Sequence, residues 1–343
     1  SPIMIIFLIS LIVSPFNFIS QSKEKDIWWD EDFSFRKMIE IPFDTSESLA
    51  EYQPINSRIY FEKPCFAKNE KLHSIRVIYQ YNGELIELES QIYDLNYSTE
   101  NIINACSIVF LIPPEANGKE KYYLYYDESD RGAIDYFDHV DVEKNHYRYE
   151  PIPGYPFESS YYKITQHGSV VYGVSYEGEF LGFSTAHQIT KFSEDTDQVK
   201  SPKNAESWAS FDFYYQTGEK IKDFSSTIQT LQSKKIMVDG NLMVKMSITS
   251  TTPKKEIKTT AEYTYFYCPT EHKRIHTHVK HETLRDITVY DSDGLGNICG
   301  LQVGIMKSPS IEELNFGEMF PYMHVYDQSN VIREYDLDTN PEY

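Results

Sequence analysis

Residues 74–93, SIRVIYQYNGELIELESQIY, place two runs of apolar and aromatic residues on either side of the dipeptide Asn82-Gly83. Asn-Gly suits the two-residue turn between adjacent antiparallel strands, because both turn positions need a positive φ. We therefore expect a hairpin, with one strand over residues 74–81 and its partner over residues 84–93. Such a hairpin predicts an antiparallel sheet.

Further strand patterns occur on both sides of this hairpin. Residues 36–43 alternate polar and apolar side chains, and residues 57–61, 106–112 and 121–126 also read as strands. Later in the chain, strands are expected in four regions: residues 169–176, a second hairpin at Asp239-Gly240, residues 259–268 and residues 273–282. The pattern predicts an all-β fold of two β-sandwich domains, the second larger and built of long curved strands.

The predicted domain limits follow from these runs. The first β-sandwich is expected over residues 28–128 and the second over residues 158–343. Residues 129–157 are charged and then rich in proline, with Pro151, Pro153 and Pro156 close together. Since proline interrupts regular structure, this segment is predicted to be a connector.

The chain has 343 residues with a net charge of −20, and 15% of its residues are aromatic. A chain of this length can bury a substantial core, and its aromatic content argues against disorder. Its negative charge would repel a phosphate backbone, so nucleic acid is excluded as an expected partner.

The N-terminal region holds the longest apolar run, residues 3–19. Its uninterrupted part, residues 3–13, has the length of the apolar region of a signal peptide, and Ser20-x-Ser22 supplies small residues just before a charged stretch. Residues 1–22 are therefore predicted to be a signal peptide, with an uncleaved membrane anchor or a buried helix as alternatives. A secreted or cell-surface protein is expected, with membrane contact only through this segment if it is uncleaved.

Four cysteines are spread over both halves of the chain. The pairing that respects a boundary near residue 150 is Cys65–Cys106 with Cys268–Cys299, and four buried free thiols are the alternative. The absence of a Cys-x-x-Cys motif disfavours a zinc ribbon or a thioredoxin-like site. One Asn-x-Ser sequence, at Asn96, matches the acceptor for N-linked glycosylation.

Residues 28–128 resemble a family of β-sandwich modules of exported archaeal and bacterial surface proteins, the DUF2341-like family. The resemblance is carried by Trp29-x5-Phe35-Arg36-Lys37-x-Ile39-x-Ile41, by residues 74–77, by residues 109–113 and by residues 122–126. It implies a β-sandwich and names no catalytic residue. Modules of this family often accompany carbohydrate-related domains, which implies an association with glycans.

The second half resembles the galactose-mutarotase-like supersandwich of polysaccharide lyases and glycosidases. The resemblance rests on the pattern of predicted strands at residues 168–174, 263–267 and 273–276. It implies a large β-sandwich and transfers no active-site residue.

Residues 271–282, EHKRIHTHVKHE, form the densest group of residues capable of chemistry. On a strand, alternate side chains share a face, so one face would carry Arg274, His276, His278, Lys280 and Glu282. The flanking cations suit an anionic sugar better than a metal ion, and arginine can bind a carboxylate through two hydrogen bonds. A metal site and an ordinary solvated sheet face are the alternatives.

Two other segments are weaker candidates. Residues 315–326 combine aromatic rings with Glu318, Tyr322 and His324, a mixture that suits sugar binding but also suits a core. Residues 291–297 place Asp291, Asp293 and Asn297 on a glycine-containing loop. Calcium is the cation that these oxygens would suit, and a plain Asp-Gly turn is the alternative.

These observations favour an exported surface protein that binds a glycan or another cell-envelope component. The first alternative is a polysaccharide lyase or glycosidase acting on an acidic polysaccharide. Its expected catalytic residues are Arg274, His276, His278 and His324, with Lys280, Glu282, Glu318 and Tyr322 binding the ligand. There a histidine or tyrosine would remove the proton next to a uronate carboxylate while Arg274 stabilises the developing negative charge. The second alternative is a structural component of the cell envelope.

Overall fold

The computed structural model describes residues 27–178, 186–192, 205–212, 214–217, 223–225, 228–271, 273–290, 300–305, 322–326 and 332–336. The chain divides into two compact units, Ser1–Asp32 and Phe33–Tyr343. In the described part of the first unit, the Asp32 backbone N–H donates to a carboxylate oxygen of Asp30 at 2.9 Å. The predicted signal peptide or anchor lies outside the described residues.

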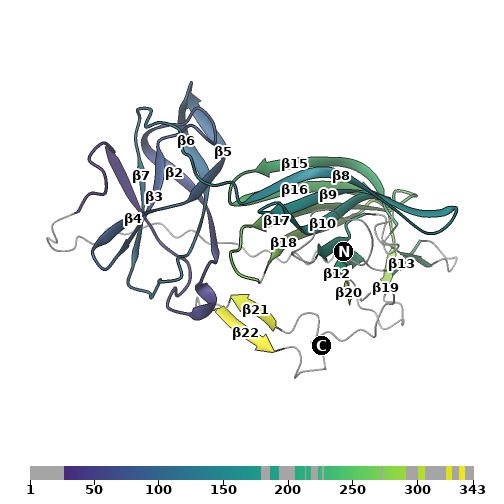
Figure 1. The fold of residues 1–343 in the computed structure, drawn as a ribbon. Helices are drawn as coiled ribbons and strands as arrows, with labels where there is room; N and C mark the ends of the chain where they lie inside the picture. The colour runs from purple at the N-terminus through teal and green to yellow at the C-terminus, as the bar shows by residue number, and fades with distance from the viewer. Residues whose placement is uncertain are drawn as a thin grey trace. The chain divides into compact units, whose positions relative to one another are not determined.

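The described residues are mostly β-strand, and every strand pair is antiparallel (Figure 1). Their one helical element is a 3-10 turn, η1 (Ser48–Ala50). None of the described helical structure has the length and apolar character needed to cross a bilayer. The prediction of an all-β fold is confirmed.

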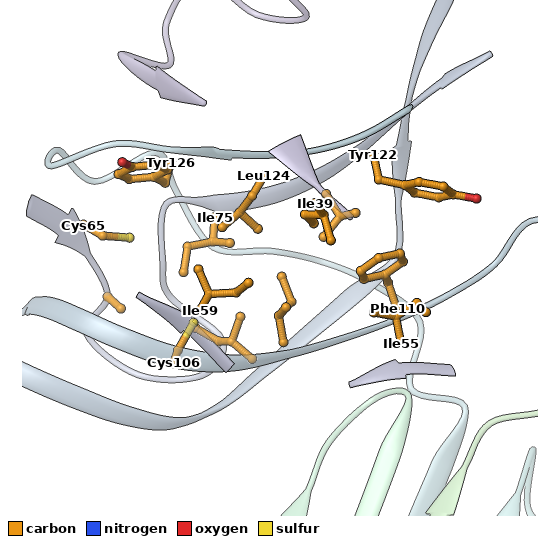
Figure 2. Close-up of a cluster of buried hydrophobic side chains, with 14 of the residues drawn as sticks. Ile39, Ile55, Ile59, Cys65, Ile75, Cys106, Phe110, Tyr122, Leu124 and Tyr126 are labelled. Atoms are coloured by element: carbon orange, nitrogen blue, oxygen red, sulfur yellow. The ribbon is translucent and has the colours of Figure 1, made fainter. Parts of the chain in front are cut away.

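The N-terminal sandwich of the second unit consists of two sheets around one core. One sheet has the order β1 (Phe35–Ile39), β7 (Lys121–Tyr126), β3 (Ile75–Tyr81), β4 (Glu84–Leu88), and the other has the order β2 (Pro54–Phe66), β6 (Ile102–Leu111), β5 (Ser90–Thr99). Side chains from both sheets meet in a buried cluster that includes Ile39, Ile75, Cys106, Phe110 and Leu124 (Figure 2). Burial of these side chains provides the main driving force for this sandwich.

The predicted hairpin at Asn82-Gly83 is present. Strands β3 and β4 pair next to the turn through Tyr81 and Glu84, and both turn residues have positive φ, 50° for Asn82 and 84° for Gly83. The partner strand is shorter than the expected 84–93, however. Pairing in this sheet ends at Leu88, and β5 begins at Ser90 in the opposite sheet. The apolar pattern continues through this crossing, so sequence alone could not locate it.

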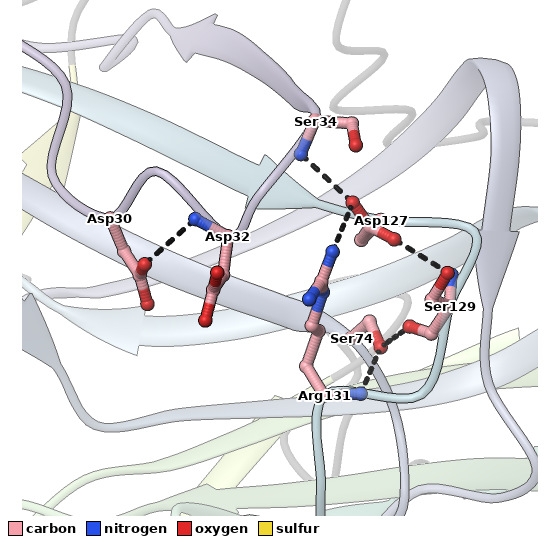
Figure 3. Close-up of polar contacts among 7 residues, drawn as sticks. All are labelled: Asp30, Asp32, Ser34, Ser74, Asp127, Ser129 and Arg131. Atoms are coloured by element: carbon pink, nitrogen blue, oxygen red, sulfur yellow. Dashed lines mark hydrogen bonds and ion pairs between the residues drawn. The ribbon is translucent and has the colours of Figure 1, made fainter.

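A buried carboxylate fixes the end of this sandwich where β1 starts and β7 stops. Asp127 accepts hydrogen bonds from the backbone N–H groups of Ser34, at 2.9 Å, and Ser129, at 2.8 Å, and it pairs with Arg131 at 3.1 Å (Figure 3). Burial alone would raise the pKa of Asp127, but these hydrogen bonds and the arginine lower it well below its usual value. The carboxylate therefore joins two segments of the sandwich, the start of β1 and the turn that follows β7.

The C-terminal sandwich also consists of two sheets. The larger has the order β20 (Gly300–Ile305), β12 (Ala205–Asp212), β11 (Ile189–Phe192), β10 (Ser169–Gly178), β9 (Tyr155–Gln166), β8 (Val140–Ile152), and the smaller has the order β15 (Thr230–Asp239), β16 (Met243–Thr251), β17 (Ile257–Phe266), β18 (Ile275–Thr283). Their facing side chains form a buried cluster that includes Tyr162, Val174, Met246, Tyr263 and Tyr265. The strands expected at residues 169–176, 259–268 and 273–282 are confirmed as β10, β17 and β18.

Part of the predicted connector is instead a long hairpin. Strands β8 and β9 pair from Val140 with Gln166 to Ile152 with Tyr155, and Gly154 at the turn has φ of 85°. The connector prediction is therefore wrong from Val140 onward. The prolines are tolerated because they lie near the tip of the hairpin, where the register shifts, and because β8 is an edge strand.

The second predicted hairpin, at Asp239-Gly240, joins β15 to β16. Here a glycine leaves space for a close neighbour. The Gln91 side chain accepts hydrogen bonds from the N–H groups of Leu242, at 2.9 Å, and Met243, at 2.7 Å, and donates to the Met243 carbonyl at 3.1 Å. A Cβ atom at Gly240 would lie 2.3 Å from this side chain. Gln91 thus binds the backbone of the turn, and a larger residue at position 240 would displace its amide.

Two small sheets complete the described structure. One has the order β14 (Asp223–Ser225), β13 (Tyr214–Gln216), β19 (Thr288–Tyr290), and the other pairs β21 (Tyr322–Tyr326) with β22 (Ile332–Asp336).

Replacement of Asp127 by alanine should lower the free energy of unfolding by about 3 kcal/mol, because the buried carboxylate would no longer bind two backbone N–H groups and Arg131. Urea denaturation at pH 7 measures this loss. Asp130, an exposed aspartate that accepts one hydrogen bond from Gly132 at 2.8 Å, is the matched control. D130A should cost less than about 1 kcal/mol. Equal losses for both variants would contradict the role given to Asp127.

Candidate functional site

The residues predicted from the histidine-rich segment lie together at the edge of the smaller sheet of the C-terminal sandwich. Among the described strands, β18 pairs with β17 alone, and His276, His278, Lys280 and Glu282 are exposed while the residues between them are half-buried. The alternation thus places these four side chains on one face, as predicted, whereas Arg274 directly precedes the strand and is half-buried. Ile275 and Val279 pack against the core on the other face.

The same face continues across the other three strands. Thr264 lies opposite His276, Glu262 opposite His278, Thr260 opposite Lys280 and Lys258 opposite Glu282, while Lys245 on β16 and Lys235 on β15 extend the row. We call this surface the basic face, defined by Lys235, Lys245, Lys258, Thr260, Glu262, Thr264, Arg274, His276, His278, Lys280 and Glu282.

Both carboxylates of the basic face are engaged by lysines. Lys245 lies 2.8 Å from Glu262, and Lys258 lies 3.6 Å from Glu282. Within the described part of the chain, no ion pair engages Lys235, Arg274 or Lys280. The face therefore has three cations that no described carboxylate neutralises, in a chain whose net charge is −20.

The environment of His276 differs from that of an isolated surface histidine. Its ring meets the edge of the Phe266 ring, with centroids 5.0 Å apart. Surrounding protein atoms lower the pKa of His276, and the nearby Arg274 guanidinium lowers it further. The imidazole is thus neutral at pH 7 and can accept a hydrogen bond or a proton.

His281 belongs to the opposite, core-facing side of β18, as its position in the alternation predicted. Its Nδ1 lies 2.9 Å from the Thr259 hydroxyl, and burial lowers its pKa to about 4. It is a core histidine.

The remaining predicted residues are not brought to the basic face by any described contact. Tyr322 and His324 lie on β21, whose one partner in the described sheets is β22. Glu318 and the loop residues Asp291, Asp293 and Asn297 lie outside the described residues. Among the residues that the structure describes, no group of three acidic, histidine or cysteine side chains is arranged to hold a metal ion.

The predicted Cys65–Cys106 disulfide is absent, and this correction has a structural reason. Cys65 lies opposite Ile103, and Cys106 lies opposite Ile59, so the two cysteines occupy different steps of the β2–β6 ladder. Both are buried free thiols, as is Cys268. Burial raises the pKa of Cys106 to about 12 and raises that of Cys65 as well. Cys299 lies outside the described residues.

A second polar cluster, which we call the histidine pair, was not predicted. His139 Nδ1 lies 2.9 Å from His167 Nε2, and His139 Nε2 lies 2.7 Å from a carboxylate oxygen of Glu89. The Tyr267 ring stacks on His139 with centroids 3.9 Å apart, and the exposed Phe137 meets both imidazoles edge-on. These residues come from separate parts of the chain, and no local motif marks them.

The hydrogen bonds of the histidine pair occupy both ring nitrogens of His139. A carboxylate only accepts, so His139 donates from Nε2 to Glu89. Nδ1 of His139 and Nε2 of His167 share the second hydrogen bond. Burial, together with the charges of His139 and Lys273, lowers the pKa of His167. Since both ring nitrogens of His139 are already hydrogen-bonded, they cannot hold a metal.

A third cluster lies within the core of the C-terminal sandwich. His187 Nδ1 lies 3.0 Å from the Tyr263 hydroxyl, and its Nε2 lies 2.5 Å from the Ser250 hydroxyl. All three side chains are buried, and burial lowers the pKa of His187 to about 3. A serine next to a histidine resembles a nucleophile and its base, but here both are enclosed, so the cluster serves the fold.

The N-terminal sandwich has a pocket of about 350 Å³ whose polar lining includes Asp44, Thr45 and Glu120. Burial would raise the pKa of Glu120, but hydrogen bonds from the Thr45 hydroxyl and from the N–H groups of Asn117 and Lys119 lower it overall. Both oxygens of the Glu120 carboxylate already accept hydrogen bonds from the protein. This side of the pocket therefore serves the fold.

Comparison with known proteins finds no family model that matches this chain and no curated protein that matches it significantly.

The buried cysteines should be unreactive in the folded protein. With C299S to remove the fourth thiol, we expect almost no reaction with a thiol reagent at pH 8 in native buffer and three reactive thiols in denaturant. Recovery of fewer than three thiols from a denatured, unreduced sample would show that a disulfide forms.

Acid should destabilise the protein through its buried histidines. Burial lowers the pKa of His187 and of His73 to about 3, whereas an unfolded chain binds a proton near pH 6.5. The stabilising contribution is complete above about pH 6.5 and falls by about 1.4 kcal/mol per pH unit for each histidine as the pH decreases. Urea denaturation between pH 7 and pH 5 gives this slope.

H187Q should have a lower free energy of unfolding at pH 7 than the unmodified protein. Between pH 7 and pH 5 its free energy of unfolding should also change less per pH unit, by about the contribution of one histidine. H146Q, at an exposed position of β8, is the control and should leave the slope unchanged. An unchanged slope in H187Q would mean that His187 takes up protons normally in the folded protein.

Proposed function

We propose that the protein is an exported surface protein that binds an acidic polysaccharide on the basic face. The observation that carries this proposal is the group of three cations, Lys235, Arg274 and Lys280, that no described carboxylate neutralises. The expectation of export comes from the N-terminal sequence.

The chemistry of the basic face suits a repeating anion. Arg274, which directly precedes β18, and Lys280 on that strand are six residues apart, which corresponds to about 20 Å on extended backbone. A single exposed ion pair contributes less than about 1 kcal/mol, so useful affinity requires several contacts at once. A polymer with a carboxylate on many of its sugars provides them.

Hydroxyl groups on the same face would bind the uncharged part of a sugar. Thr260 and Thr264 lie beside Lys280 and His276 on the neighbouring strand, and Ser247 and Thr249 follow on β16. No exposed aromatic ring lies among the described residues of this face, since Phe266 is buried. Binding is therefore proposed to depend on charge and hydrogen bonds, with little stacking of sugar on aromatic rings.

The test is retention of the full chain on immobilised polyuronate, with neutral dextran as the reference polymer. We expect retention at low salt that decreases as salt is raised, because salt screens exposed charges. R274E combined with K280E should weaken binding at least about tenfold, since two attractive contacts become repulsive.

The control exchanges the same amount of charge elsewhere. K68E combined with K144E changes two exposed lysines outside the basic face. This variant should bind like the unmodified protein. If both double variants lose affinity equally, net charge explains binding and the basic face is not the site. If the unmodified protein is not retained at low salt, the proposal fails and a structural role in the envelope is favoured.

Binding should also strengthen as the pH falls from 8 toward 5, because protonation of His276 adds positive charge to the same face. The lowered pKa of His276 places this gain at a lower pH than for an ordinary histidine. Affinity measured at several pH values in the unmodified protein and in H276Q gives the contribution of His276. A pH dependence that H276Q retains in full would exclude this histidine.

A second candidate, a lyase acting on the same polymer, is favoured by one observation. His276 is held neutral beside Arg274, as a base next to a group that neutralises a carboxylate would be. Incubation with polyuronate, followed at the absorbance of unsaturated sugar ends, tests it. Product that disappears in H276A would support the lyase, whereas binding without product would support the binding function alone.

A further inference from the structure

The acceptor sequence Asn96-Tyr97-Ser98 lies near the end of β5, just before the chain turns into β6 (Figure 1). In the three-stranded sheet, β5 is an edge strand that pairs with β6 alone among the described strands. Residues 90–92 at the start of β5 are buried, but residues 96–100 are all exposed. The sequence thus occupies the part of the hairpin that extends beyond the core.

The surroundings of Asn96 leave space for a large substituent. Asn96 pairs with Ala105, and the register shifts on both sides of it. Asp94, two residues earlier, has a positive φ of 54°. Such irregularities bend an edge strand and interrupt its ladder. In the described structure no side-chain hydrogen bond holds the Asn96 amide, so a substituent there would displace no partner.

We infer that Asn96 is a site of N-linked glycosylation. In this reaction the Asn96 side-chain nitrogen forms a bond to the anomeric carbon of an oligosaccharide carried by a lipid phosphate or pyrophosphate. The bond from that carbon to the lipid phosphate breaks, the phosphate leaves with the bonding electron pair, and the amide loses one proton. The co-substrate is therefore a lipid-linked oligosaccharide. This inference is independent of the anionic ligand proposed for the basic face.

The folded hairpin also indicates when the transfer must occur. The Ser98 hydroxyl, which the acceptor sequence requires, donates to the Ile102 carbonyl at 3.2 Å. The Tyr97 hydroxyl donates to the Lys68 carbonyl at 2.9 Å. Both hydrogen bonds hold the acceptor sequence against neighbouring backbone. The oligosaccharide must therefore be attached to Asn96 before β5 and β6 pair. The attached glycan would then remain in solvent at the edge of the sheet.

A glycan at this position has a physical consequence for the fold. An edge strand exposes backbone N–H and C=O groups to pairing with another chain, and proteins protect such edges in several ways. The bulky, hydrated glycan would cover the end of β5, where Tyr97 is 46% exposed. The modified protein should therefore associate less with itself than the unmodified protein.

The experiment is translation of the full chain, preceded by a cleavable secretory signal, in the presence of endoplasmic-reticulum microsomes. Protection from added protease identifies the translocated molecules. We expect these molecules to gain the mass of one oligosaccharide, which an endoglycosidase for N-linked glycans removes. N96Q and S98A should both lack this gain, while S98T should retain it.

E84T is a matched positive control, because it places an acceptor sequence on Asn82 at the exposed turn between β3 and β4. It should add a second oligosaccharide. Translocated protein that is modified at Asn82 in E84T but never at Asn96 would overturn the inference, as would a mass gain that persists in N96Q. Light scattering of the glycosylated and enzymatically deglycosylated forms should show more self-association after removal of the glycan.

Discussion

The alternation of side chains along an antiparallel strand is the constraint on which the candidate site depends. In β18, Ile275 and Val279 are held against the core, and this fixes the rotation of the whole strand. His276, His278 and Lys280 must then face water. A shift of the register by one residue would turn the charged side chains toward the core, at a cost on the order of several kcal/mol for each unpaired ion. The basic face is thus a consequence of core packing.

The same constraint explains which parts of the fold the sequence predicts. Turns with their own chemistry, such as Asn82-Gly83 and Asp239-Gly240, were located correctly because the turn residues limit the backbone directly. The crossing at Glu89 was not predicted, because a strand that changes sheets keeps its alternating pattern. The β8–β9 hairpin was also missed. Proline excludes a strand only where its missing N–H is needed, and an edge strand near a hairpin tip has no such need.

The residues of the candidate site and of the buried clusters also differ in whether the sequence could predict them. The residues of β18 were predictable because their relation is local: they are two positions apart on one strand. Glu89, His139 and His167 could not be predicted together, since the hydrogen bonds among them join residues 28 and 50 positions apart. The same holds for His187, Ser250 and Tyr263. Composition does not show which histidines the fold buries, and burial determines whether a histidine titrates near neutrality.

Buried and surface histidines therefore give the molecule opposite responses to acid. His73 and His187 are kept neutral by burial, so acid favours the unfolded chain, whereas His276 lies on the surface, and its protonation adds positive charge to the basic face. As the pH falls, attraction to an anion on this face increases while the stability of the sandwich that supports it decreases. A bound anion would oppose that loss, because a ligand that binds only the folded state stabilises it. If the proposed anion binds the basic face, its affinity and the protein's resistance to acid are coupled through the two faces of one sheet.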